Sequence, residues 1–484
     1  MSVATELTRI QNAKAGLKTA IEAKGVTVSS SALLDAYPAL VDSIQSGSPQ
    51  EKLLNFYDYD GTLIASYEGS EIAGLTALPT APDHSTDEVP LTFDEWNWTL
   101  AEIKEYYTAN PNSMIIVGAN YHTADGKTHV FFTIEDVNNG NCSIRYSNQA
   151  TVNWGDGTTN TSEYIATHTY SQPGTYHCVI DTSPDTTHLR FGDSSIKSEF
   201  SNVTKVFFQA GINFNDYEFA YCHYLQVVSI PSGMVHNNLR NTFYNCFNLK
   251  CIAFPRQAGN ITGSLMLINC YADVISYPGN ATGIEGGGVN ISNLTIPSGV
   301  TTIGENLFNA NNRIKTLIFP NTVTSIGLNA FYGCNHIQNV TLPNSLTSIE
   351  RQFFQNCSSL RIITIPETVT TIGNSAFYSC SKLEAVNLSS TGITTIGNSA
   401  FYGCSFLKNF SIPETVTTIG NSAFNSSGLL SITVKATTPP TLGNTTALPT
   451  NPGMKIYVPA GTLATYQAAT NWSNFASYME ELPE

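Results

Sequence analysis

Two carboxylates lie two residues apart in the run Asp58-Tyr-Asp60-Gly-Thr-Leu63, directly after an apolar stretch. In an enzyme, one carboxylate of such a pair can attack an electrophile while the other transfers a proton beside a divalent cation. Asp and Gly are also the residues that form tight turns. A run of mostly turn-forming residues therefore favours a strand that ends in a turn over an active site.

The same run matches the nucleophile motif of the haloacid-dehalogenase-like phosphatases, and Gly192-Asp-Ser194 is similar to the acidic metal loop of that family. The resemblance implies that Asp58 attacks phosphorus and that Asp60 acts as acid and base beside Mg²⁺. That family also needs a parallel α/β sheet and a catalytic Lys between the two motifs, where this sequence has a β-rich segment. We therefore expect no enzyme, no catalytic residue and no cofactor.

A second acidic run, Asp83-His-Ser-Thr-Asp-Glu88, contains residue types that bind metals. Its spacing fits no known set of calcium or zinc ligands, so we expect a solvated acidic loop and no metal site.

Seven of the ten cysteines recur at one position of a sequence repeat: Cys222, Cys246, Cys270, Cys334, Cys357, Cys380 and Cys404. A ladder of equivalent thiols without CxxC pairs or nearby histidines predicts a buried small position instead of a metal site. Oxidation of neighbouring thiols to disulfides is the alternative.

The composition is poor in charge. Among 484 residues, 42% are hydrophobic and 12% are charged, and the net charge is −15. Soluble domains average roughly 25% charged residues, so this surface must consist largely of Ser, Thr, Asn and Gly. The sequence has no cluster of Lys and Arg, and we expect no nucleic-acid partner. It has no apolar run of 18 residues either, and we expect no membrane insertion.

The longest region is repetitive. Prolines recur every 23 residues at Pro297, Pro320, Pro343 and Pro366, and the stretch from Ile365 to Leu383 reads I-P-x-x-V-T-x-I-G-x-x-A-F-x-x-C-x-x-L. This pattern resembles the BspA-type leucine-rich repeats, which implies a solenoid whose coils stabilise one another. We expect roughly ten turns between residues 186 and 437, followed by a C-terminal α/β cap at 438–484.

Alternation along the repeat strands predicts which side chains point outward. These are mostly small and uncharged, and they suit recognition of a glycan or a protein through many weak contacts. The alternative is a soluble sheet face without a ligand. The candidate binding residues are Asn339, Thr341, Thr364, Asn387, Asn409, Ser411 and Thr433.

The segment 113–185 alternates in the manner of β-strands. Trp154-Gly-Asp-Gly157, His168-Thr-Tyr170 and Pro173-Gly-Thr-Tyr176 resemble a PKD-type immunoglobulin-like domain. The resemblance implies a β-sandwich that acts as a spacer or an adhesive module, with glycines in a tight turn and aromatic rings in the core.

Residues 1–46 keep the spacing of a helical hairpin, and residues 51–112 predict a small α+β unit. In the second unit, Thr92 and Glu95 suggest a capping box that opens a helix. A hairpin of this size cannot hold a core alone, so its apolar residues need a partner, either other virion proteins or the next domain of the same chain. These residues are Leu7, Ile10, Leu17, Ile21, Leu33, Leu34, Leu40 and Ile44.

The expected fold is thus multidomain and mainly β. BspA-type repeats beside PKD-like domains are typical of bacterial adhesins, and they also resemble parts of structural proteins of phages that infect gut bacteria. Residues 5–18 are similar to leaders of such phage proteins, and residues 55–98 look like a module found with them. The first residues lack the pattern of a secretory signal, which favours assembly in the host cytoplasm.

We therefore expect a virion structural protein on the exterior of the particle. A tail fibre or adhesin that attaches to a glycan or protein of the host surface is the first interpretation. A head fibre or capsid decoration protein, or a bacterial cell-surface adhesin, are the alternatives. A dimer or trimer would add weak contacts through avidity.

Overall fold

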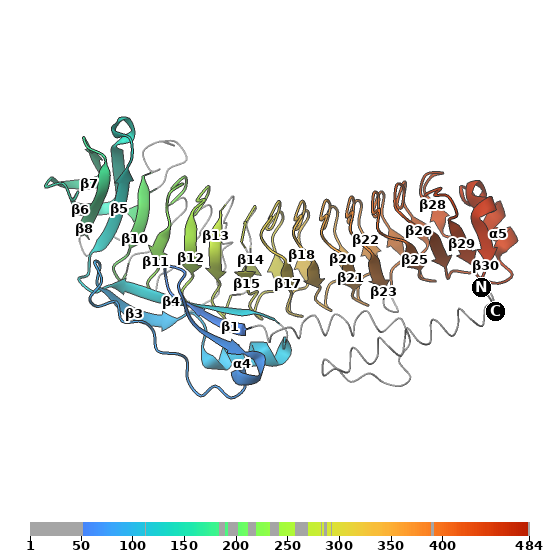
Figure 1. Cartoon of the computed structure of the whole chain (residues 1–484), viewed down its shortest axis with the longest axis horizontal. Coiled ribbons are helices and arrows are strands. Elements are labelled where there is room, and N and C mark those ends of the chain that lie inside the picture. The colour runs from blue at the N-terminus through green and yellow to red at the C-terminus, as the bar shows by residue number, and fades with distance from the viewer. Residues whose placement is uncertain are drawn as a thin grey trace, which may run out of the picture.

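The computed structural model (Figure 1) describes residues 52–111, 113–182, 189–191, 202–211, 219–232, 242–256, 270–281, 283–284, 288–291, 293–388 and 392–482. The predicted helical hairpin at 1–46 and the run at 192–194 lie outside these residues. The described part is mainly β and contains a solenoid of about ten turns, which confirms the predicted fold class at this level. None of its helices has the length and apolar character to cross a bilayer.

The first unit is a four-stranded sheet with the strand order β2-β1-β4-β3. Strand β1 pairs antiparallel with β2 and parallel with β4, and β3 pairs antiparallel with β4. We call this sheet and its two helices the N-terminal module. Its elements are β1 (Lys52–Tyr57), β2 (Leu63–Glu68), α3 (Gly69–Ile72), β3 (Leu91–Trp96), α4 (Leu100–Ala109) and β4 (Ile115–Thr123).

The helix α4 begins later than the sequence suggested. Thr99 accepts the N–H of Glu102 at 3.2 Å, and the Glu102 carboxylate accepts the N–H of Thr99 at 2.8 Å. The capping box at Thr92 and Glu95 was therefore wrong, because those residues pair with β4 as part of β3. The module also continues past the expected boundary at 112, since β4 is one of its central strands.

The next strands belong to one ten-stranded sheet that runs into the solenoid, in the order β15-β13-β12-β11-β10-β5-β8-β6-β7 with β9 beside β6. Strand β10 joins the two parts, because it pairs antiparallel with β5 and parallel with β11. The sequence predicted a separate β-sandwich at 113–185. In the structure, the strands β5 to β8 instead share one hydrogen-bonded sheet with β10 and the first solenoid strands. The bounds are β5 (Thr128–Ile134), β6 (Asn141–Asn153), β7 (Thr159–Thr169), β8 (Gly174–Thr182), β9 (Leu189–Arg190) and β10 (Val203–Phe207), with a 3₁₀ turn η2 at Val137–Asn139.

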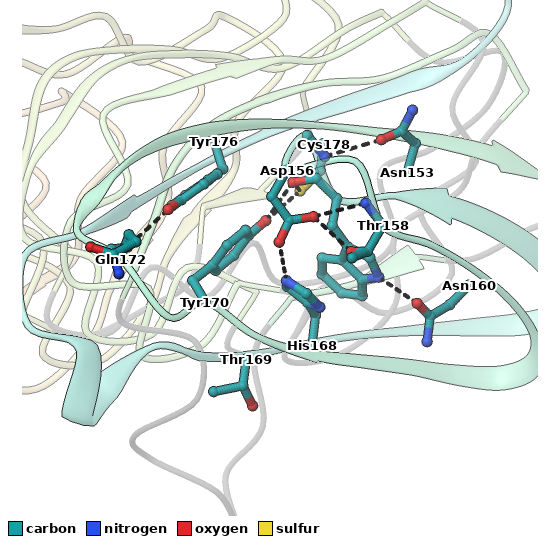
Figure 2. Close-up of polar contacts among 12 residues, drawn as sticks. Asn153, Asp156, Thr158, Asn160, His168, Thr169, Tyr170, Gln172, Tyr176 and Cys178 are labelled. Carbon is teal, nitrogen blue, oxygen red and sulfur yellow. Dashed lines mark hydrogen bonds and ion pairs between the residues drawn. The ribbon is translucent and has the colours of Figure 1, made fainter.

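Several residues of the PKD-like motif contact one another, among them Asp156, His168, Tyr170 and Tyr176 (Figure 2). The Trp154 side chain is fully buried, and the Tyr170 hydroxyl donates to the Trp154 carbonyl at 2.8 Å. Asp156 accepts the Thr158 N–H at 3.0 Å and contacts His168 Nε2 at 2.8 Å. Gly155 has φ +79°, and a Cβ there would lie 2.5 Å from the His177 carbonyl oxygen, so the tight turn requires glycine.

Each solenoid coil contributes a longer main strand and, in most coils, a short second strand, all in parallel pairing. The main strands are β11 (Val227–Ser229), β12 (Leu249–Ala253), β13 (Ala272–Ser276), β15 (Asn293–Leu294), β17 (Thr316–Ile318), β19 (Asn339–Thr341), β21 (Ile362–Ile365), β23 (Ala385–Leu388), β25 (Asn409–Ile412) and β27 (Ser431–Val434). The short strands are β14 (Gly283–Ile284), β16 (Thr302–Ile303), β18 (Ser325–Ile326), β20 (Ser348–Ile349), β22 (Thr371–Ile372), β24 (Thr395–Ile396), β26 (Thr418–Ile419) and β28 (Thr441–Leu442).

The solenoid core is a stack of equivalent side chains, one per coil. Phe377 and Phe401, for example, stack with ring centroids 5.2 Å apart and planes 2° from parallel. No single coil buries both faces of such a ring, so each coil depends on its neighbours for stability.

The cysteine ladder lies inside this stack, and all ten cysteines are buried thiols outside disulfides. The prediction of a buried small position is confirmed, and the disulfide alternative is not what the structure shows. The thiols also serve as donors: Cys357 Sγ donates to the Phe331 carbonyl one coil earlier at 3.1 Å, and Cys380 does the same to Phe354 at 3.0 Å. Burial raises the pKa of Cys380 to about 12, which keeps the thiol protonated.

The last coil is closed by β29 (Lys455–Val458), α5 (Leu463–Ala468), the 3₁₀ segment η3 (Trp472–Tyr478) and β30 (Met479–Glu481). Tyr466 and Trp472 are buried, and their polar atoms donate to the carbonyls of Ala436 and Pro440, each at 2.7 Å. In Figure 1 the coils follow one another along the long axis, with this cap at one end and the N-terminal module beside the first coils.

Candidate binding surface

The outward side of the main strands forms two columns of residues. In β19, Asn339 and Thr341 are exposed while Val340 between them is buried. The register aligns these residues from coil to coil, as in Thr316 with Asn339 and in Ser411 with Thr433. We call the columns of β17–β27 the outward strip. The first column is Thr316, Asn339, Ile362, Ala385, Asn409 and Ser431, and the second is Ile318, Thr341, Thr364, Asn387, Ser411 and Thr433.

All seven residues predicted from the sequence lie on this strip. Six of them are exposed, and Thr433 is half-exposed next to the cap. The strip brings them to one face, in the order in which their coils follow one another. The eight residues predicted for docking to a virion (Leu7, Ile10, Leu17, Ile21, Leu33, Leu34, Leu40 and Ile44) lie outside the described part of the chain, so that role stays a prediction.

The strip carries no charge, and its polar groups bond along the solenoid axis. The Asn387 side-chain amide donates to the Thr364 hydroxyl at 3.3 Å, and the Ser431 hydroxyl donates to Asn409 Oδ1 at 2.7 Å. Just before two of these strands, Arg361 and Glu384 form a bidentate ion pair at 2.9 and 3.0 Å. A ligand of the strip would therefore meet hydroxyl and amide groups instead of a net charge.

A depression of about 540 Å³ crosses β19 and β21, and Thr341 and Thr364 contribute to its wall. The sequence interpretation missed the other lining residues, which are Val340, Leu342, Asn344, Pro366, Glu367 and Thr368. Several of them belong to the turn that follows the strand-ending proline, and the regular spacing of Pro343 and Pro366 is the signal that could have located them. A second depression of about 490 Å³ lies near the cap, between Glu414 and Thr441.

The N-terminal module covers the same sheet face over the earlier coils. The second column continues there as Ser229, Ala253, Ser276 and Thr295, each two residues before a proline, and none of the four is exposed. Strand β4 lies on them: the Ile116 N–H donates to Thr295 Oγ1 at 2.7 Å. The sheet face thus has a covered part at β11–β15 and an uncovered part at β17–β27.

The two carboxylates of Asp58 and Asp60 lie in the hairpin turn between β1 and β2. The Asp58 N–H donates to the Thr62 carbonyl at 2.8 Å, and Gly61 has φ +88°. The strand-and-turn interpretation is confirmed, because the motif leads into an antiparallel strand instead of a helix.

His84, from the acidic loop, is held between two carboxylates. Its Nε2 lies 2.8 Å from Asp58 Oδ2, and its Nδ1 lies 2.7 Å from Asp87 Oδ2. Burial lowers the pKa of His84, but the two carboxylates raise it by more, and the net direction is upward. Burial also raises the pKa of Asp58. Among the described residues, no group of three or more His, Cys, Asp or Glu side chains is placed to hold a metal ion.

The comparisons with known proteins concern the repeat. The family described as "BspA type leucine rich repeat region" matches residues 191–287, 285–391 and 324–443 with six copies. No curated protein matches the chain significantly.

Similar solved structures include a leucine-rich repeat protein from Bacteroides ovatus, with 17% identity over 63% of this chain and 97% of the other, at a TM-score of 0.39. Another is a leucine-rich cell surface protein from Faecalibacterium prausnitzii, with 22% identity over 54% of this chain and 72% of the other, at a TM-score of 0.34. The family match indicates no enzyme family, and it spans just over half of the residues. The chain therefore belongs to the BspA-type leucine-rich repeat proteins.

Proposed function

We propose that the chain is a non-catalytic attachment protein that binds a component of a host cell surface through the outward strip. The observation that carries the proposal is the uncovered part of the main sheet. Over β17–β27 the polar groups of the strip are exposed and in register, whereas the same face is covered at β11–β15. Side chains with small entropy cost and many hydrogen-bonding groups suit binding by repeated weak contacts.

We place this function on a phage particle, as a tail fibre or adhesin. The support is the resemblance of residues 5–18 and 55–98 to parts of phage structural proteins. In this proposal residues 1–46 dock on other virion proteins and make a dimer or trimer. The PKD-like strands act as a spacer. A head fibre or decoration protein would use the same parts at another place on the particle, and a cell-surface adhesin would use the same strip.

The attachment test uses fluorescently labelled full-length protein on intact cells of the bacterial host. Thr341→Arg and Thr364→Arg place bulk and charge on the strip. Thr394→Arg is the matched control, because Thr394 is also an exposed threonine but lies beside the short strand β24. We expect both strip variants to bind at least about tenfold more weakly and the control to bind as the wild type does. Equal binding by all four proteins would refute the role of the strip.

Immunogold labelling of purified particles tests the location. Label on the tail supports the tail fibre, and label on the capsid supports the head fibre. Label on bacterial cell envelopes, with none on particles, would replace both with the surface adhesin.

A further inference from the structure

The covered part of the main sheet shows how a strand of the same chain lies on this surface. Strand β4 runs along the solenoid axis, across the main strands. Met114 contacts Thr295 of the β15 coil, Ile116 contacts Ser276 of β13, and Gly118 lies over Ala253 of β12. Alternate residues of the strand thus contact three successive coils.

The hydroxyl groups of the second column bind the backbone of this strand. Thr295 Oγ1 accepts the N–H of Ile116 at 2.7 Å and donates to the carbonyl of Met114 at 2.9 Å. Ser276 Oγ lies 2.8 Å from the carbonyl of Ile116 and can donate to it. A hydroxyl is both donor and acceptor, and it can therefore satisfy either backbone group of an extended chain.

The fit also restricts the side chains of the bound strand. A Cβ on Gly118 would lie 2.4 Å from the Ala253 Cβ, so only glycine fits over that coil. Ile116 fits because it packs against Cys251 and Val274 of the first column. Alternate residues of the strand face the surface, which thus takes an apolar side chain at Ile116 and a small residue at Gly118. Asn120, the next in this alternation, is polar, and its amide donates to the carbonyls of Ile230 and Ala253 at 2.9 and 2.8 Å.

The uncovered strip repeats these features. Thr341 and Thr364 are the equivalents of Thr295, each two residues before a proline, and both are exposed in the depression of about 540 Å³. Ile362 and Ala385 give the first column apolar side chains on two neighbouring coils, in register, while its other four residues are polar. The strip is therefore continuous with an interface that already holds an extended strand.

We propose that the outward strip binds an extended polypeptide segment of the host surface component, lying along the solenoid axis with small or apolar residues facing the strip. This inference rests on the proposed function and narrows its ligand to protein. The strip has six coils, β17 to β27, about 4.8 Å apart, so it spans roughly 29 Å and accommodates about nine residues of an extended chain. The Lys455–Glu480 ion pair and Tyr457 of the cap end the strip on one side, and the N-terminal module ends it on the other.

The test selects a random dodecapeptide display library against the full-length protein, with a glycan array in parallel. We expect enriched peptides with Gly, Ala or Ser at alternate positions. Their affinity, measured by fluorescence anisotropy, should fall at least about tenfold with Thr341→Arg or Thr364→Arg and stay unchanged with Thr394→Arg.

Four results would overturn the proposal. Three of them are no enriched peptide, enriched peptides whose affinity the strip variants leave unchanged, and glycan binding that depends on the strip. A dimer that light scattering detects in the wild type and not in the strip variants would assign the strip to a second copy and overturn it as well. Cell attachment separates the two hypotheses. If the strip variants lose attachment but no peptide binds, the proposed function stands and the polypeptide ligand fails. If they attach normally, the proposed function itself fails.

Discussion

The contact between the N-terminal module and the solenoid includes one buried amide that bonds to both parts, and its removal gives a quantitative test. Asn97 is completely buried, and its Nδ2 donates to the Phe254 carbonyl at 3.1 Å and to Ser276 Oγ at 2.9 Å. Its Oδ1 accepts the N–H of Gly118 at 2.8 Å. The side chain therefore links β4 to two coils at once.

Asn97→Ala leaves the Gly118 N–H and the Phe254 carbonyl without the partner that Asn97 provides. Each buried group that loses its hydrogen bond costs about 1–3 kcal/mol, so the docked state should lose at least about 2 kcal/mol. Each 1.4 kcal/mol corresponds to about a tenfold change in an equilibrium constant. The β4 amides that exchange when the module undocks should therefore exchange at least about 30-fold faster.

The assay is hydrogen exchange with mass spectrometry on the full-length protein, with peptides that cover β4, β12 and β25. Asn138→Ala is the control, because Asn138 is exposed and its side chain bonds only within the turn to Asp136. We expect faster exchange at β4 and β12 in Asn97→Ala and unchanged exchange at β25. If Asn97→Ala exchanges as the wild type does, the module is held by other contacts and the amide network does not position β4 on the sheet.

Three further predictions concern stability and reactivity. Ser427 occupies the ladder position after Cys404, and its buried hydroxyl has no hydrogen-bond partner among the residues that the structure describes. Ser427→Cys should therefore stabilise the protein by about 1 kcal/mol, and a lower Tm in thermal unfolding would contradict this. The pKa of His84 is raised in the folded protein, so its contribution is fully present below the unfolded value of about 6.5 and is lost as the pH rises through the folded value. Urea unfolding at pH 6 and pH 8 should therefore show a loss of stability in the wild type that is smaller in His84→Gln; equal losses would assign the dependence to other groups. Thiol reagents should not modify Cys380 in the native state, because burial raises its pKa to about 12, and they should modify it after unfolding; native labelling at neutral pH would show that the coil opens.

The repeat could be predicted from the sequence because its signal is periodic. The 23-residue step of Pro343 and Pro366 sets the register, and alternation around Val340 places Asn339 and Thr341 outside. The strip residues follow from these two local rules, without knowledge of any long-range contact.

The docking of the N-terminal module could not be predicted in the same way. Asn97 and Ser276 are 179 residues apart, and neither stands in a pattern that relates it to the other. The misplaced helix start has a local cause: Thr92 and Thr99 are each followed three residues later by Glu, and only the pairing of β3 with β4 decides between them. The sequence predicted a domain boundary after residue 185. The structure joins the two predicted units into one sheet, because β10 pairs with β5 on one side and with β11 on the other.

The low charge of the chain is a consequence of the solenoid and by itself says little about binding. Equivalent residues stack in register about 4.8 Å apart, so a charged residue at a repeated position would face its own copy on both sides. Like charges in directly opposed positions destabilise a sheet, and neutral hydroxyls and amides avoid this cost. Arg361 and Glu384 show the permitted exception, because their signs alternate between neighbouring coils. A neutral strip would arise in a solenoid with or without a ligand. The case for a polypeptide ligand rests instead on β4, which shows that Ser276 and Thr295 of the same column hold an extended chain within this molecule.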